Sequence, residues 1–119
     1  MEIPLSPFMQ RALDLAQEAA LAGEVPVGAV IVRNGVEIAA CANAMRALKD
    51  PTAHAEMEAI SAAAREIGNE RPDDCALWVT LEPCPMCAGA IAHARIARVY
   101  YAAPDPKGGG VDHGPRIFT

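Results

Sequence analysis

The run VPVGAVIV at residues 25–32 constrains the fold more than any other stretch of this chain, because nearly every position in it is apolar. A strand with one face in water alternates apolar and polar residues, whereas a continuous apolar run indicates a strand covered on both faces. Asn34 and Gly35 follow directly, and this dipeptide is the strongest short-range sign of a two-residue hairpin. We therefore predict a central strand at residues 25–32, paired antiparallel with a second strand at residues 36–41.

The other elements are predicted from hydrophobic periodicity and from residues that begin or end helices. Ser6 and Pro7 fit the N-cap and first position of a helix, and Gly23 fits its end. The further predicted elements are a helix at residues 50–67, a strand at 76–80, a helix that begins within EPCPMC and a strand at 97–102. A strand, a helix and a strand in that order predict a parallel crossover. The expected fold is a three-layer α/β/α domain with a mixed β-sheet.

The length and charge of the chain limit its number of domains, its cellular location and its possible partners. Its 119 residues predict a single domain over residues 1–119, large enough to fold without disulfides. No apolar run approaches the roughly 18 residues of a membrane span, and no leader pattern is present, so we expect a cytoplasmic protein without a membrane partner. Thiols stay reduced there, and clustered cysteines then indicate metal binding or catalysis. The net charge of −5 supplies no basic field for phosphate, which counts mildly against a nucleic acid partner.

Two cysteines and a histidine form a candidate zinc site. PCPMC places Cys84 and Cys87 on one side of a first helical turn, whose N-terminal amides favour the thiolate that binds zinc. His54 can supply an imidazole from the start of another helix. Three protein ligands leave the fourth zinc position open, as in catalytic sites that hold a water. Glu56, two residues after His54, is then the candidate base that moves protons between water and substrate.

Other readings of these residues remain open. A C-x-x-C pair alone is also typical of a redox site, and Cys75 as a fourth ligand would give a closed structural zinc. The H-x-E upstream favours the open metal site. Cys41 and Cys75 are otherwise expected to be small buried hydrophobes. We expect His93 to be a packed or surface histidine, and His113 to be either a solvated loop residue or a substrate contact.

With H-x-E followed by P-C-x-x-C, the sequence resembles the zinc-dependent nucleotide deaminases, and within them the bacterial tRNA-specific adenosine deaminases. The resemblance covers about residues 9–118 and includes EVPVGAVIV, DPTAHAE, TLEPCPMCAGAI and RVYYAAPDPKGG. It implies one Zn²⁺ per subunit, held by His54, Cys84 and Cys87. It also implies hydrolytic deamination of a flipped-out adenine to inosine, with Glu56 delivering protons to the ring nitrogen and the departing amine.

The resemblance further implies a set of substrate-binding residues. They are Val27, Gly28 and Ala29 in the strand, Asn43, Ala55, the turn at Glu82 and Pro83, and Asp105 with Lys107 in the loop beyond the last strand. Asn43 would hydrogen-bond the base, but it also fits a turn asparagine, and Asp105 and Lys107 also fit ordinary charged loop residues. The implied partners are the anticodon stem-loop of a tRNA, with adenosine at the wobble position, and a second copy of the chain in a homodimer.

One departure from the family concerns the C-terminus. Family members continue past the RIF segment into a further, usually basic helix that helps to hold the tRNA, whereas this chain ends at Thr119. We expect the C-terminal helix to be missing and the zinc core to be complete. The short chain and the acidic charge favour a rival, a deaminase of a free base such as guanine or cytosine, while TLEPC looks more like the tRNA enzymes. A non-catalytic zinc module is a second rival, but it would have no use for Glu56.

Overall fold

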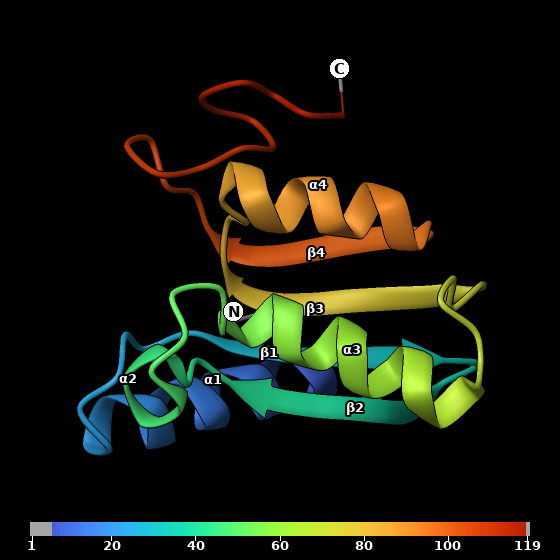
Figure 1. The fold of residues 1–119 in the computed structure, drawn as a ribbon, viewed down its shortest axis with the longest axis horizontal. Helices are drawn as coiled ribbons and strands as arrows, with labels where there is room; N and C mark the ends of the chain where they lie inside the picture. The colour runs from blue at the N-terminus through green and yellow to red at the C-terminus, as the bar shows by residue number, and fades with distance from the viewer. Residues whose placement is uncertain (1–5, 119) are drawn as a thin grey trace, which may run out of the picture.

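Four strands form one mixed sheet in the order β2-β1-β3-β4 (Figure 1). The computed structural model describes residues 6–118. Along the chain the elements are α1 (Pro7–Leu21), β1 (Gly28–Arg33), β2 (Val36–Ala42), α2 (Met45–Leu48), α3 (Ala55–Ile67), β3 (Cys75–Leu81), α4 (Pro85–Ala94) and β4 (Arg98–Ala103). β1 is antiparallel to both β2 and β3, and β3 is parallel to β4, as the strand-helix-strand order predicts.

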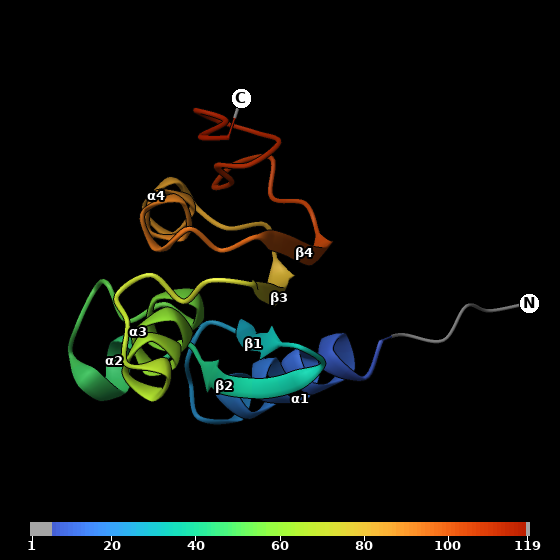
Figure 2. The ribbon, with the colours of Figure 1, turned by 90° about the vertical axis from the view of Figure 1, so that its right-hand side faces the viewer.

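Helices cover both faces of the sheet, with α1 on one face and α3 and α4 on the other (Figure 2). Val30 and Val32 of β1 pack with Met9 and Leu15 of α1, while Ile31 packs into the core beneath α3. Both faces of β1 are therefore buried, which explains why its sequence is apolar at successive positions. The predicted three-layer α/β/α architecture is confirmed.

The hairpin after β1 also forms as predicted. Asn34 and Gly35 adopt φ values of 53° and 77°, the left-handed conformation that a type I′ turn requires at both central residues. The strand itself begins at Gly28, three residues later than predicted. Pro26 has no N–H to donate to a neighbouring strand, and the Val27 N–H bonds the Val25 carbonyl locally at 2.9 Å.

The helix predicted from residue 50 begins only at Ala55. One carboxylate oxygen of Asp50 accepts the N–H and the hydroxyl of Thr52, at 2.8 and 2.7 Å, and so folds this segment into a turn. The short helix α2 before it was not predicted. His54 is consequently the N-cap of α3, and Gly68 ends that helix with φ 79°, as expected.

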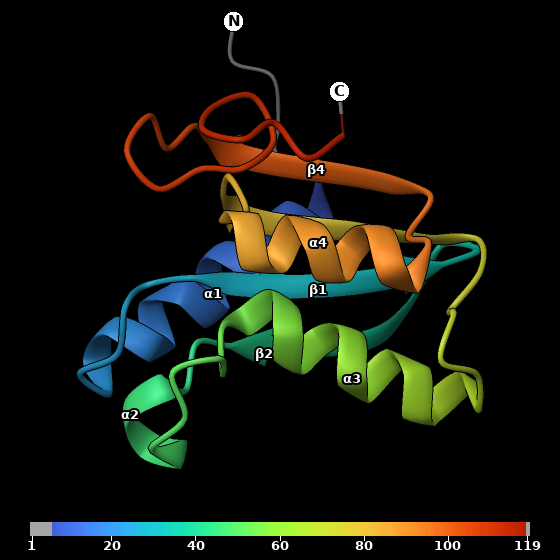
Figure 3. The same cartoon turned by 45° about the horizontal axis from the view of Figure 1, so that its top comes forward.

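The helices α1 and α4 begin directly after their N-cap residues, Ser6 and Cys84. Ser6 Oγ accepts the Phe8 N–H at 3.3 Å and caps α1, as predicted. Cys84 is the N-cap of α4, which therefore starts directly after the turn that follows β3. Residues 104–118 form an irregular segment beside α4 and β4 (Figure 3). Within residues 6–118 no helix has the length and apolar character needed to cross a membrane.

Candidate active site

Three potential metal ligands come together where α3 and α4 begin. His54 and Cys84 are the N-caps of these helices, and Cys87 lies in the first turn of α4. His54 Nδ1 lies 3.6 Å from Cys84 Sγ and 3.4 Å from Cys87 Sγ, and the three ligand atoms all lie within 4.8 Å of one another. Among residues 6–118, this is the one group of three or more such side chains at metal-binding separation.

The chemistry of this group suits zinc. A hydrogen bond from Cys87 is the main cause that lowers the pKa of Cys84 to about 5, and the Cys87 and Met86 amides at the start of α4 contribute. The pKa of Cys87 is raised, because its thiol bonds Cys84 and is buried. One thiolate is thus formed at neutral pH before any ion binds. Two sulfurs and one imidazole nitrogen are preferred zinc donors, and three ligands leave one tetrahedral position for water or substrate.

Glu56 lies directly beside this group, in the first turn of α3. Its side chain is only 4% exposed, and burial raises the pKa of its carboxyl. Cys87 lies within hydrogen-bonding reach of it. A raised pKa makes a carboxyl a better proton acceptor than a solvated one, which favours a role in general acid–base catalysis.

A cavity of about 140 Å³ opens in front of His54 and Glu56. It is lined by Val25, Val27, Asn43, Met45, His54, Ala55, Glu56, Leu81, Glu82, Cys84 and Asp105. Most of the residues expected at the site thus meet here, whereas Val25, Met45 and Leu81 were not anticipated from the sequence. The volume is well below the roughly 300–1,000 Å³ of pockets for drug-sized ligands, so it suits one heterocyclic ring system.

Asn43 is the main neutral polar group on this wall. It is 5% exposed, and its N–H donates to the Val27 carbonyl at 3.0 Å. Its side-chain oxygen accepts the Met45 N–H at 3.4 Å, a contact that does not use the two donors of its side-chain amide nitrogen. Glu24 holds the same segment, because its carboxylate oxygens accept the Arg46 N–H at 2.9 and 3.1 Å. Sequence reasoning missed Glu24, which has no periodic or motif signal.

Four buried residues expected at the site do not line the cavity, and neither does Lys107, which is exposed. Gly28 packs against α1, since a Cβ there would lie 2.0 Å from the Ala12 carbonyl oxygen. Ala29 and Pro83 are buried in the packing behind the cavity wall. Cys87 is also fully buried, and only its sulfur reaches the group with His54. These residues shape the core that supports the site.

The structure also resolves the alternatives left open for the remaining cysteines and histidines. Cys75 lies at the start of β3, the opposite end from the turn that carries Cys84, and is not part of the metal group. It is buried, and Cys41 packs partly buried against the core, as expected. His93 is exposed on α4. His113 is partly exposed and does not line the cavity, and its Nδ1 lies 2.7 Å from a carboxylate oxygen of Glu82.

Glu82 is the second buried carboxylate that lines the cavity, and no local sequence pattern indicated its partners. Burial by itself would raise its pKa, but hydrogen bonds from Asp105, His113, Val111 and Asp112 outweigh that effect and lower the pKa to about 2. Glu82 is therefore an anion at neutral pH, and as an anion it can only accept hydrogen bonds.

Comparisons with known proteins agree with this geometry. The model of the cytidine and deoxycytidylate deaminase zinc-binding region matches residues 4–103. A tRNA-specific adenosine deaminase of Agrobacterium fabrum is 52% identical over 94% of this chain and 74% of its own length. A solved structure from work on A-to-I editing by tRNA:A34 deaminases at the wobble position is 52% identical, with a TM-score of 0.92 over 93% of this chain and 80% of its own. A guanine deaminase structure from Bacillus subtilis is 47% identical, with a TM-score of 0.81 over 86% of this chain and 66% of its own.

Proposed function

This chain belongs to the zinc-binding cytidine and deoxycytidylate deaminase family, and from that premise we propose that it hydrolyses adenosine to inosine at the wobble position of tRNA. The observation that carries the proposal is the placement of buried Glu56 beside the His54, Cys84 and Cys87 group on one small cavity. Relatives that share this part of the chain act on tRNA adenosine, which supports the substrate.

We assign His54, Cys84 and Cys87 as the residues that hold zinc. A zinc ion bound there supplies a Lewis acid and a water whose pKa falls from 15.7 to about 7. The chain contributes the lowered pKa of Cys84, which provides a thiolate, and the fixed position of His54 at the start of α3. Because both helices present their N-termini here, the site also favours negative charge.

Glu56 moves the protons of the reaction. It takes a proton from the attacking water, whose oxygen bonds to C6 of the adenine, and delivers that proton to the ring nitrogen beside C6. It then moves the proton of the new C6 hydroxyl to the amino group, the C–N bond breaks and ammonia leaves, so that water and adenosine become inosine and ammonia. Burial of Glu56, which raises its pKa, matches a group that must gain and lose a proton in one turnover.

The cavity itself supports a single flipped base as the substrate. Val27 and Ala55 offer apolar walls to the ring faces, and the Asn43 side chain offers a hydrogen bond at its edge. With about 140 Å³ available, the sugar and phosphates must remain outside. A base stacked within an RNA loop has to leave the stack to enter such a pocket, and this cost is smallest where the base is already unpaired.

A guanine deaminase is the second candidate function. The 47% identical Bacillus subtilis structure with this activity supports it, and a free purine would fit the same cavity. The two candidates share the metal group and Glu56. The tRNA substrate would also contact the protein outside the cavity, whereas free guanine would bind only within it.

The decisive experiment measures ammonia release by the zinc-loaded protein in parallel on two kinds of substrate. One is an anticodon stem-loop with adenosine at the wobble position, and the others are free guanine, cytosine and adenine. We expect inosine in the stem-loop and no turnover of free bases, with Glu56→Gln inactive as the control. Ammonia from free guanine alone would transfer the protein to the second candidate and leave the roles of His54 and Glu56 in place.

We also propose that the chain works as a homodimer in the cytoplasm. The resemblance described above supports the pairing, and a tRNA substrate supports the location. Sedimentation equilibrium tests the first point: we expect twice the mass of the 12.5 kDa chain, and a monomer at micromolar concentration would contradict it.

A further inference from the structure

We propose that Glu82 is a positioning residue whose buried carboxylate fixes the loop of residues 104–114, here called the rim loop, at the edge of the cavity. In this role it places Asp105 and the neighbouring backbone where the RNA beside the target base must pass. The inference rests on the proposed function for its substrate, but the anchoring of the loop can be measured without any substrate.

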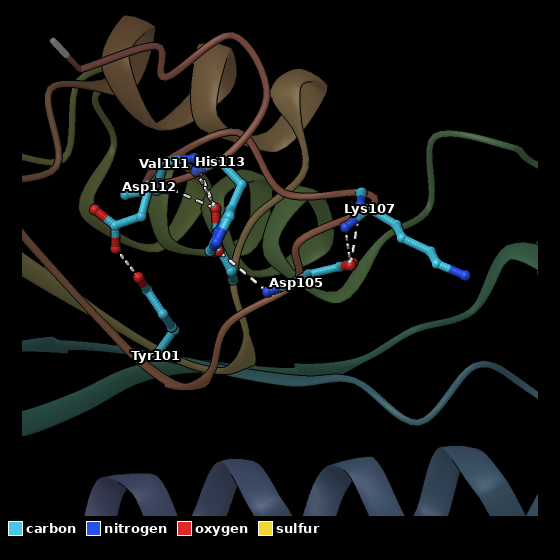
Figure 4. Close-up of polar contacts among 8 residues, drawn as sticks. Tyr101, Asp105, Lys107, Val111, Asp112 and His113 are labelled. Carbon is cyan, nitrogen blue, oxygen red and sulfur yellow. Dashed lines mark hydrogen bonds and ion pairs between the residues drawn. The ribbon is translucent and has the colours of Figure 1, made fainter.

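The hydrogen bonds of the Glu82 carboxylate are all with the rim loop, whose residues Asp105, Val111, Asp112 and His113 are labelled in Figure 4. Its Oε2 accepts the consecutive backbone N–H groups of Val111, Asp112 and His113, at 3.2, 3.0 and 3.1 Å. Its Oε1 accepts the Asp105 N–H at 3.1 Å and lies 2.7 Å from His113 Nδ1. Successive N–H groups that converge on one oxygen form an anion-binding concavity, and here the anion comes from the chain itself.

The Glu82 side chain is not available to a ligand. It has no solvent-exposed surface, and both of its oxygens are occupied by the rim loop. A buried carboxylate is costly unless it is hydrogen-bonded, so the burial of Glu82 and the observed position of the loop depend on one another. Glu82 therefore borders the cavity without offering its carboxylate to the substrate, and its effect on binding has to pass through the loop.

The rim loop packs closely against Glu82 and against the turn between β3 and α4. A Cβ on Gly109 would lie 2.2 Å from Glu82 Oε2, and a Cβ on Gly110 would lie 2.7 Å from the Pro85 nitrogen. The Gly110 N–H donates to the Pro83 carbonyl at 2.8 Å. Only glycines allow this approach to the turn between β3 and α4.

Fixing Asp105 fixes the part of the rim loop that meets the cavity. Asp105 lines the cavity, and its Oδ1 accepts the N–H groups of Lys107 and Gly108 at 3.2 and 2.9 Å, which forms a tight turn. Lys107 is exposed and is the only lysine or arginine of residues 104–114. In a chain with net charge −5, the position of this cation relative to the cavity matters for a phosphate backbone.

The test is Glu82→Gln in the zinc-loaded protein. The variant keeps the size of the side chain but replaces one accepting oxygen with an amide NH2 group, which donates, so one set of rim-loop N–H groups loses its acceptor. We expect faster hydrogen exchange in residues 104–114, unchanged zinc content, and a KM for the stem-loop raised roughly tenfold with a smaller change in kcat. Glu66→Gln, which removes the same charge from an exposed position on α3, is the matched control and should change none of these.

A second variant approaches the same contact from the loop. Gly109→Ala leaves Glu82 in place but puts a methyl group against its Oε2, and it should give the same exchange and KM phenotype. If Glu82→Gln does not fold, Gly109→Ala alone tests the proposal. Unchanged exchange in residues 104–114, or a released loop with the wild-type KM, would overturn the proposal. If the wild-type protein does not act on the stem-loop, the proposed function fails, and with it the RNA role of the rim loop. That result is distinct from a defect confined to the Glu82 variants.

Discussion

Gly28 offers a sharp test of the packing between the sheet and α1. A Cβ at this position would lie 2.0 Å from the Ala12 carbonyl oxygen, 2.8 Å from Leu15 Cβ and 2.9 Å from the Ala16 nitrogen. Two of these atoms belong to the backbone of α1, so no side-chain rotation can relieve the clash. In Gly28→Ala the helix must move away from β1 by more than 1 Å to restore contacts near 3.4 Å.

The expected cost follows from this displacement. Overpacking of a core costs typically about 1–3 kcal/mol, and a clash with backbone belongs at the upper end of that range. Replacing glycine restricts the unfolded chain and returns about 0.4–1 kcal/mol. We therefore expect a net loss of roughly 2 kcal/mol in the free energy of unfolding, which corresponds to a fall in Tm of about 8 °C for a domain of this size.

Calorimetry and urea unfolding of the zinc-loaded protein measure this effect, with Gly89→Ala as the matched control. Gly89 lies within α4, and a Cβ there would meet nothing within 4 Å. Alanine is a better helix former than glycine by about 1 kcal/mol, so this variant should be slightly more stable than wild type. An unchanged Tm for Gly28→Ala, together with a raised KM, would refute the packing argument and return Gly28 to the wall of the substrate pocket.

Three further predictions concern the site and the thiols. Glu56→Gln should keep zinc and the wild-type Tm while kcat falls about 10²- to 10⁴-fold, and turnover near wild type in a stopped ammonia assay would contradict its role. Cys87→Ala should lose zinc by atomic absorption, and stoichiometric zinc in the purified variant would remove Cys87 from the ligand set. Burial raises the pKa of Cys75 above its usual 9.0, so this thiol ionises first in the unfolded chain. The stability that the buried thiol contributes is complete below pH 9 and is lost as the pH rises further. Urea unfolding at increasing pH should therefore show a smaller loss of unfolding free energy in Cys75→Ala than in wild type. The same dependence on pH in both proteins would exclude a contribution from Cys75.

Features encoded by short-range patterns could be predicted from the sequence. The hairpin at Asn34 and Gly35, the double-sided burial of β1 and the parallel pairing of β3 with β4 all follow from local propensity and element order. The deaminase family was likewise predicted from the H-x-E and P-C-x-x-C motifs. These motifs are short because a ligand set at a helix start needs only one turn of chain.

Tertiary structure alone decided which distant segments touch. The motifs predicted that His54 and Cys87 share a metal, but only the packing of the two helices fixes the 3.4 Å between His54 Nδ1 and Cys87 Sγ. Gly28 looked like a pocket residue and proved to be the contact point of α1, because a glycine signals close approach without naming its partner. Glu82 and His113 are separated by 31 positions, and their bond forms only because the rim loop folds back over the start of α4. Periodicity records which side of an element is buried, and the partners on that side are set by the packing of the whole domain.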